Sequence, residues 1–278
     1  MLNLLSFHEK NTKFFYYIVL IGAGGTGGYA VQRITKMMNA FNNVRTYLMI
    51  ADPDVIEKKN LLRQPFISED ITLKKADVLA KRYGTTYGIK IGSYSDTYVE
   101  TIAQLKSLFS HTDYMNEKGQ FIQKVLIGAV DNDFSRKIMN DYFQTEDDLI
   151  YIDAGIEGVY LPSGEPTEWS LEEKEEHLES GYSGQVVVGV KKSNKIILSP
   201  LQAVYPIDNQ DSIPPSHNCG VEPYHPQRMI TNEMAAFQIT AVLNEMFAQN
   251  SILVHYCNFS SRTGNSRPVF IEESLLTQ

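Results

Sequence analysis

The first 155 residues alternate short apolar runs with segments in which apolar side chains recur every three or four positions. A short run rich in β-branched and aromatic residues is typical of a buried strand, whereas the recurrence is typical of a helix. The pattern predicts strands over 16–21, 46–51, 89–94, 125–130 and 149–153, and helices over 29–41, 73–87, 99–109 and 135–143. Strands that alternate with helices indicate right-handed crossovers and a parallel sheet covered on both faces. We therefore expect a doubly wound, Rossmann-like α/β core over residues 14–155.

The second half has a less regular pattern. Residues 165–180 carry seven glutamates, which is typical of a solvated helix or an inserted flap. Five of the eleven prolines lie in 205–228, which predicts a loop and not a helix. The pattern also predicts an antiparallel strand pair over 185–190 and 195–198, a helix over 232–247 and a strand over 252–259. We expect antiparallel strands to extend the parallel core within one continuous domain, with a nucleotide-binding half over 1–155 and a sheet extension over 156–278.

Composition narrows the class of protein. With 25 Lys and Arg against 33 Asp and Glu, the net charge is −8, which disfavours a broad nucleic-acid interface. No apolar run approaches the roughly 18 residues of a membrane span, and the N-terminus lacks a signal-peptide pattern. We therefore expect a cytoplasmic protein without membrane contact. The two cysteines, Cys219 and Cys257, are too few to form a disulfide framework or a four-thiolate zinc site by themselves.

A glycine-rich segment joins the first predicted strand to the first helix. Gly22, Gly24 and Gly27 have the spacing of a dinucleotide-binding loop, and Gly25 lies between them. Free amides at the start of the helix favour an anion. Asp52 lies 25 residues beyond Gly27, a position suited to ribose hydroxyls. This arrangement predicts nucleotide binding and leaves two chemistries open, a nicotinamide-dependent oxidoreductase and an enzyme that adenylylates a carboxylate.

Further motifs follow the glycine loop in a fixed order. They are Asp52-Pro-Asp54, then Asn60-Leu-Leu-Arg63-Gln64, then Lys75 on a predicted helix, then Asp131-Asn132 after the fourth strand. Over residues 14–155 this series resembles the ThiF/MoeB/HesA superfamily. The resemblance implies an ATP- and Mg²⁺-dependent homodimeric adenylyltransferase that activates the C-terminal carboxylate of a ubiquitin-like or sulfur-carrier protein.

The second half more narrowly resembles the plasmid-associated ThiF-like proteins of the PRTRC type. This likeness is carried by Ile152-Asp153-Ala-Gly155, Gly184-Gln185-Val186-Val187, a proline-rich loop that contains Cys219, and a helix that begins near Asn232. The acidic segment over 165–180 interrupts it.

The matched residues fit the chemistry of adenylylation. A carboxylate must approach a polyanion, so the site has to neutralise charge. Arg63 can bridge phosphate oxygens and Lys75 supplies a point charge. Asn60 and Gln64 can donate hydrogen bonds to phosphate or orient the arginine. Asp131 is placed to hold Mg²⁺, with Asn132 beside it, and Asp54 is a candidate for assisting the metal or bracing the loop.

Each motif alone has a simpler explanation. Asn60–Gln64 is compatible with a helix cap, Lys75 with a solvated lysine, and Asp131-Asn132 with an ordinary N-cap. The substrate also stays open between a carrier protein and a peptide or small-molecule carboxylate, and a non-catalytic nucleotide-gated interaction protein is a further alternative. Many relatives also carry two Cys-x-x-Cys pairs for a structural zinc. This chain has neither pair, so we expect no zinc.

Relatives often lend an N-terminal arginine to the partner subunit's ATP. Here the first arginine is Arg33, and Lys10 or Lys13 is the candidate substitute.

The two cysteines receive different predictions. In the family that the chain resembles, a loop cysteine can attack the acyl-adenylate, which makes Cys219 the candidate nucleophile. His217, two positions away, is a candidate for lowering the pKa of this thiol, and the alternative is an ordinary loop thiol. Cys257 lies in an apolar run and is predicted to be a packed core residue.

Overall fold

The computed structural model describes residues 1–9, 12–110, 120–206, 213–217 and 226–272. The strands are β1 (Leu2–Asn3), β2 (Lys13–Ile21), β3 (Arg45–Ala51), β4 (Ile91–Tyr94), β5 (Gln120–Gly128), β6 (Leu149–Ile156), β7 (Ser183–Lys192), β8 (Lys195–Leu198), β9 (Ser251–Ile252), β10 (Val254–Ser260) and β11 (Asn265–Phe270). The helices are α1 (Gly25–Ala40), α2 (Lys75–Tyr87), α3 (Ile102–Leu108), α4 (Asp133–Thr145), α5 (Leu171–Glu179), α6 (Leu201–Val204) and α7 (Met229–Gln249). The predicted α/β class is confirmed.

One sheet runs through the molecule in the order β11-β10-β7-β6-β5-β2-β3-β4, with β8 paired to β7. The strands β4, β3, β2, β5 and β6 are mutually parallel. From β6 onward the pairings are antiparallel, so the sheet continues without a break from the first half of the chain into the second. The chain order reverses between β2 and β5, and ligands bind beside such a point in open α/β sheets.

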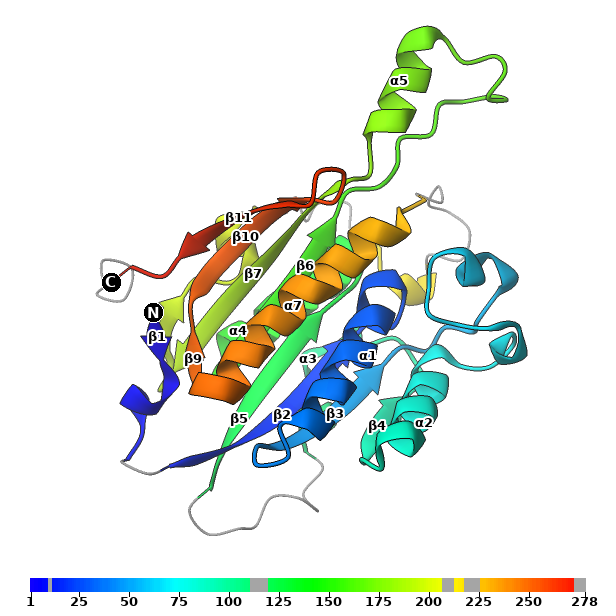
Figure 1. Ribbon diagram of the computed structural model, residues 1–278. Helices are drawn as coiled ribbons and strands as arrows, with labels where there is room; N and C mark the ends of the chain where they lie inside the picture. Colours follow the sequence, from blue (N-terminus) through cyan, green and yellow to red (C-terminus); the bar gives the residue numbers. More distant parts are fainter. Residues whose placement is uncertain (10–11, 111–119, 207–212, 218–225, 273–278) are drawn as a thin grey trace.

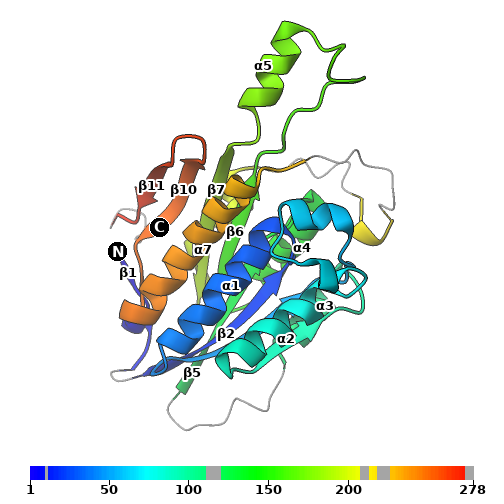
Figure 2. The same cartoon turned by 45° about the vertical axis from the view of Figure 1, so that its right-hand side comes forward.

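Alternate side chains of β2 pack on opposite faces of the sheet. Tyr16, Ile18 and Leu20 belong to an apolar cluster with residues of α1, α2 and α7. Phe15, Tyr17 and Val19 belong to a second cluster with residues of α3 and α4. Figures 1 and 2 show α1, α2 and α7 on one face of the sheet and α3 and α4 behind it. Because β2 is covered on both sides, its whole length is apolar, as the sequence pattern predicted.

The acidic segment forms an arm that projects beyond the end of the sheet (Figure 1). Its helix α5 has no buried side chain and begins with a capping box between Ser170 and Glu173. Arg228 holds the base of the arm, because its guanidinium donates to the carbonyl oxygens of His177 and Ser180 at 2.9 and 2.8 Å. The arm is therefore a solvated helix carried by two connecting segments, one of the two forms that the sequence predicted.

The structure differs from the prediction mainly near the ends of the chain. The strand predicted over 252–259 is two strands, β9 and β10, and β9 pairs with β1 at the N-terminus. The edge strand β11 was not predicted, because it is largely exposed and contains Pro268, which only an edge strand tolerates. Cys257 is buried at 5% exposure, as predicted. None of the described helices is long and apolar enough to cross a membrane.

Candidate functional site

A cavity of about 790 Å³ opens where β2, β3 and β5 end. It lies beside the point where the strand order reverses, so loops from different parts of the chain meet there. The predicted residues that line it are Gly22, Gly24, Gly25, Asp52, Asp54, Asn60, Arg63, Gln64, Lys75, Asp131 and Asn132. Gly27 is buried behind this lining. Cys219 lies outside the described residues, and its proposed role stays a prediction.

Steric limits explain two glycines of the loop. Gly22 has φ +89°, which disfavours any side chain. A Cβ on Gly27 would lie 1.8 Å from the carbonyl oxygen of Gly22. The loop can therefore turn directly into α1, whose N-cap residue is Gly24. The amides at this helix start have no intrahelical partner and carry partial positive charge, which suits a phosphate.

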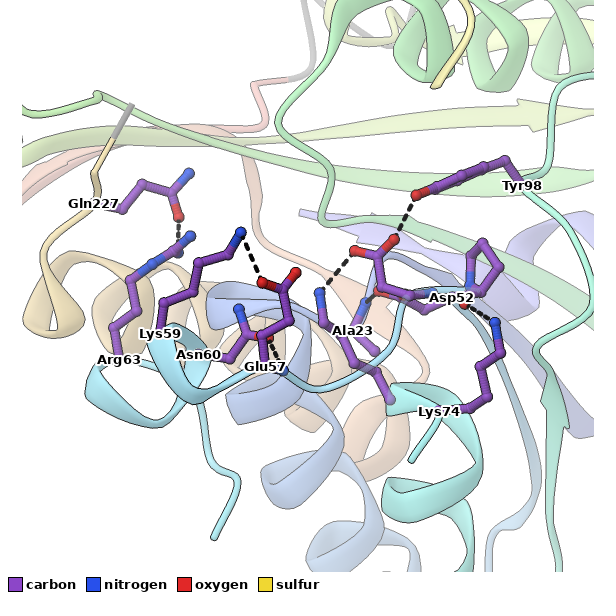
Figure 3. Close-up of polar contacts among 12 residues, drawn as sticks. Ala23, Asp52, Glu57, Lys59, Asn60, Arg63, Lys74, Tyr98 and Gln227 are labelled. Atoms are coloured by element: carbon purple, nitrogen blue, oxygen red, sulfur yellow. Dashed lines mark hydrogen bonds and ion pairs between the residues drawn. The ribbon is translucent and has the colours of Figure 1, made fainter. Parts of the chain in front are cut away.

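Asp52 holds the glycine loop in place. Its carboxylate is only 7% exposed and accepts hydrogen bonds from the amides of Ala23 at 2.6 Å and Asp54 at 2.8 Å, as Figure 3 shows for Ala23. Burial raises the pKa of Asp52, while Lys75 and the two amides oppose that shift. Asp52 therefore braces the glycine loop. Its contact with a ribose stays a prediction.

Asp54 pairs with Lys75 and Tyr98 at the edge of the cavity. Its Oδ2 lies 2.7 Å from Nζ of Lys75, and its Oδ1 accepts a hydrogen bond of 2.5 Å from the Tyr98 hydroxyl. Burial alone would raise the pKa of Asp54, but the ammonium and the two hydrogen bonds together lower it. Lys75 is 6% exposed, so it is a buried ion-pair partner and not a solvated lysine.

The segment after Asp54 contains a short 3₁₀ helix, Lys58–Leu62. Asn60 in this helix and Arg63 and Gln64 just after it line the cavity. Asn60 caps this helix, because its Oδ1 accepts from the amide of Glu57 at 2.8 Å. Gln64 is buried, and its Oε1 has no hydrogen-bond partner among the described residues. Arg63 donates to Oε1 of Gln227 at 2.5 Å (Figure 3). The cap predicted as the simple alternative therefore exists, and the same segment also lines the cavity.

The loop between β5 and α4 forms the opposite wall. Asn132 is the N-cap of α4 and accepts from the amide of Ser135 at 2.8 Å, while Asp131 is exposed to the cavity. Asn132 therefore caps the helix, which was the simpler explanation, and both Asp131 and Asn132 also line the cavity. Arg136, one turn into α4, also lines the cavity and binds the buried carboxylate of Asp153.

Several lining residues that make polar contacts escaped the sequence analysis as site residues, among them Tyr98, Arg136, Gln227 and Asn232. Asn232 was noted only as the approximate start of a helix. Its Oδ1 accepts from the Thr26 hydroxyl at 3.1 Å, and a Cβ on Gly25 would lie 2.2 Å from that oxygen. The start of α7 therefore packs against the start of α1. A contact across 206 positions leaves no pattern in the sequence.

The cavity fits a nucleotide with its metal. Its volume lies within the ~300–1,000 Å³ typical of small-molecule sites. It combines the amides of the glycine loop, the cations Arg63 and Lys75, and the Gln64 oxygen that has no partner among the described residues. The described residues contain no cluster of three metal-ligating side chains. Mg²⁺ in nucleotide sites usually takes one or two carboxylates plus phosphate oxygens, and Asp131 meets that need.

The ThiF family matches residues 6–266, nearly the whole chain. This protein belongs to the ThiF family. The predicted resemblance is therefore confirmed at the level of the family, while the narrower PRTRC branch stays a prediction. Solved structures with the same fold include Escherichia coli MccB with AMPCPP and MccA, and MccB with N-formylated MccA. Their TM-scores are 0.58 and 0.60, their sequence identities are 15% and 14%, and both cover 94% of this chain.

A structure of PaaA matches with a TM-score of 0.55 and 15% identity over 92% of this ThiF-family chain. The match covers 64% of the PaaA chain and 64% of each MccB chain, so the present chain spans less than two thirds of their length. At such low identity, the likeness shows a shared fold. None of the curated proteins matches the sequence.

Proposed function

We propose that this ThiF-family protein is an ATP- and Mg²⁺-dependent adenylyltransferase that activates a carboxylate. One observation carries the proposal: the glycine loop, Arg63, Lys75 and Asp131 line a single cavity although they come from four separate segments. A phosphate-binding loop alone would also serve a nicotinamide cofactor. Cations around the loop and an exposed carboxylate opposite it favour chemistry at the phosphates.

The chain's residues would bind, orient and neutralise charge. The amides at the start of α1 bind phosphate oxygens, and Arg63 and Lys75 balance the negative charge of two anions brought together. Asp131 would hold Mg²⁺, which would neutralise charge on the departing pyrophosphate, and ATP would supply the electrophilic α-phosphorus. A substrate carboxylate oxygen would form a bond to the α-phosphorus. The bond between this phosphorus and the oxygen that bridges the α- and β-phosphates would break, and pyrophosphate would leave. No general base is required, because the carboxylate is already ionised at neutral pH.

The acyl substrate we propose is the C-terminal carboxylate of a ubiquitin-like or sulfur-carrier protein. This assignment rests on the motif series that resembles carrier-activating enzymes. The MccB structures contain MccA, which supports the alternative of a shorter peptide carboxylate. A carrier protein with a free C-terminus and the same protein amidated at that C-terminus distinguish carboxylate activation from mere binding.

Nucleotide binding is the first test, because it needs no knowledge of the acyl substrate. Calorimetry with MgATP and with NAD should show at least about tenfold tighter binding of MgATP. Lys75→Ala should weaken MgATP binding by ~10–100-fold, since a charge-assisted hydrogen bond is worth ~1.5–3 kcal/mol. Lys81→Ala is the matched control, because Lys81 lies on the same helix and is exposed. Tighter binding of NAD than of MgATP would instead favour the oxidoreductase.

Isotope exchange between pyrophosphate and ATP tests the reaction itself. A carrier protein that is a substrate should stimulate exchange, and its C-terminally amidated form should not. Asp131→Ala should abolish the stimulation. Intact MgATP binding without exchange for any carrier or peptide carboxylate would favour the nucleotide-gated interaction protein.

We further propose that Cys219 accepts the activated acyl group: its sulfur forms a thioester with the acyl carbon, the bond from that carbon to the phosphate oxygen breaks, and AMP leaves. Cys219→Ser should leave pyrophosphate exchange within about twofold of wild type, because exchange precedes acyl transfer. The same variant should lose the thiol-sensitive acyl-enzyme adduct seen by intact-mass spectrometry. An unchanged adduct in this variant would exclude Cys219 as the acceptor.

A further inference from the structure

The side chain of Arg136 makes several polar contacts beside the cavity. Its side chain is 15% exposed and lies against the loop that carries Asp131. Its Nη2 donates to the carbonyl oxygen of Val130 at 2.8 Å, and its Nη1 lies 3.3 Å from Oδ1 of Asp133. These two contacts flank Asp131 and Asn132 on either side.

The same guanidinium is anchored to the neighbouring strand. Its Nε lies 3.3 Å from Oδ1 of Asp153, and its Nη2 lies 3.4 Å from the carbonyl oxygen of Ala154. Asp153 is 1% exposed, and its second oxygen accepts a hydrogen bond of 2.6 Å from the Tyr151 hydroxyl. Both ends of the carboxylate are thus held inside the protein, so the guanidinium has a rigid support.

We infer that Arg136 is a positioning residue, which fixes the loop between β5 and α4 so that Asp131 faces the metal at the phosphates. The inference rests on the proposed function. Asp131 is exposed and at a loop position, so its own packing does not determine its direction. The Arg136 guanidinium binds the carbonyl oxygen of Val130 before Asp131 and the side chain of Asp133 after it. These two contacts restrict the conformations of the loop that carries Asp131. Groups that orient a metal ligand in this way typically account for ~10–100-fold in metal affinity.

The network also pairs the buried charge of Asp153 with that of Arg136. An arginine that bound only the loop would leave Asp153 ionised and unpaired in the core, which is strongly unfavourable. Burial raises the pKa of Asp153, and Arg136 is the main influence that opposes this rise. The buried pair and the loop contacts therefore form one unit, which lies between β6 and the wall of the cavity.

The test removes both members of the buried pair, because loss of Arg136 alone would leave a buried charge and endanger folding. Arg136→Gln with Asp153→Asn should fold and should bind ATP without divalent metal within about threefold of wild type. The gain in ATP affinity on adding Mn²⁺ should fall by ~10–100-fold. Asp131→Ala should cause a similar loss, and combining it with the pair should add little, because the two changes act on one interaction.

Hydrogen exchange supplies a readout that does not depend on metal. The peptide over 129–136 should exchange faster in the double variant, while the core strand β2 stays protected. The matched control is Lys137→Gln with Asp141→Asn, which removes a partly exposed ion pair of 2.8 Å on the same helix and should change neither quantity.

The outcomes separate the two proposals. A double variant that keeps the full Mn²⁺ gain and the wild-type exchange over 129–136 overturns the role of Arg136 and leaves the proposed function intact. A wild-type protein whose ATP affinity does not respond to Mn²⁺ overturns both proposals together.

Discussion

Two carboxylates two positions apart, Asp52 and Asp54, have pKa values shifted in opposite directions. Asp52 is buried and receives two backbone amides, and burial raises its pKa. Asp54 is also penalised by burial, but it meets the Lys75 ammonium and the Tyr98 hydroxyl directly, which lower its pKa. The direction of each shift thus follows from which partners the fold places at each carboxylate.

The ion pair between Asp54 and Lys75 predicts a pH dependence. Because the pKa of Asp54 is lower in the folded protein than in the unfolded chain, the pair contributes stability above the unfolded value of about 4, and that contribution is lost as the pH falls through the folded value. Asp54→Asn should cost about 1–2 kcal/mol at pH 7, less than a fully buried pair because the Asp54 side chain is 39% exposed.

Urea unfolding from pH 7 to pH 3 measures this dependence. The difference between wild type and Asp54→Asn should shrink steadily below pH 4. A difference that stays constant down to pH 3 would contradict the predicted role of the ion pair.

Gly27 offers a steric prediction. Gly27→Ala places a Cβ 1.8 Å from a backbone oxygen, so it should cost about 3 kcal/mol or more in unfolding free energy. Gly264→Ala is the comparison, because Gly264 has φ +72° but open space around it. It should cost only about 1 kcal/mol. Equal losses in thermal or urea unfolding would show that crowding at Gly27 is unimportant.

At the scale of elements, the molecule contains two kinds of helix. Helix α7 is central, since nine of its residues are buried, including Leu243 at 0% exposure. Helix α5 has no buried side chain, while Leu171 and Leu178 are 86% and 63% exposed. Its nine residues are shorter than the roughly 12–15 needed for a marginally stable isolated helix, so its capping box and the anchored base of the arm must support it.

The arm should therefore be separable from the folding of the core. Replacing residues 163–176 with a short Gly–Ser linker should change the thermal unfolding midpoint by no more than a few degrees. Leu243→Ala, by comparison, should cost about 2–5 kcal/mol. A large destabilisation on loss of the arm would mean that α5 supports the core through contacts absent from the isolated chain.

At the scale of the whole molecule, a single sheet unites the two predicted halves of the chain. The start of α7 and the segment just before it close one side of the site. Gln227, before the helix, binds Arg63, and Asn232, in the first turn of the helix, binds Thr26. The glycine loop is thus completed by residues about 200 positions away. A fragment over 1–155 would lack that wall of the cavity and the strands that cover β6.

Homodimerisation remains a prediction from the family resemblance. The chain has a mass of 31.5 kDa, so light scattering during size-exclusion chromatography should give twice that mass at micromolar concentration. The partner would then be the source of whatever cation replaces the N-terminal arginine of relatives. A mass of one chain across the accessible concentrations would require the site to work without a partner, and Lys13 lies at the far end of β2 from the cavity.

Much of the site could be predicted because its motifs are local. The glycines, Asp52, Asp54, Asp131 and Asn132 follow predicted strand ends, while Asn60, Arg63, Gln64 and Lys75 belong to the ordered motifs between them, and all but the buried Gly27 line the cavity. Tyr98 and Arg136 were missed because each acts through a partner on another segment. Their hydrogen bonds to Asp54 and Asp153 exist only once β4, β6 and α4 are assembled.

The sequence by itself determined the parallel core, since continuous apolar runs and three-to-four-residue periodicity depend only on neighbouring positions. It also determined where the chain turns tightly into α1, because the turn at Gly22 needs a residue that tolerates positive φ. Only the tertiary structure decided that Lys75 is buried against Asp54, that Arg136 reaches the loop at Asp131, and that α7 closes the cavity. These contacts join segments far apart in the chain, and their energies depend on burial and distance, which no local pattern records.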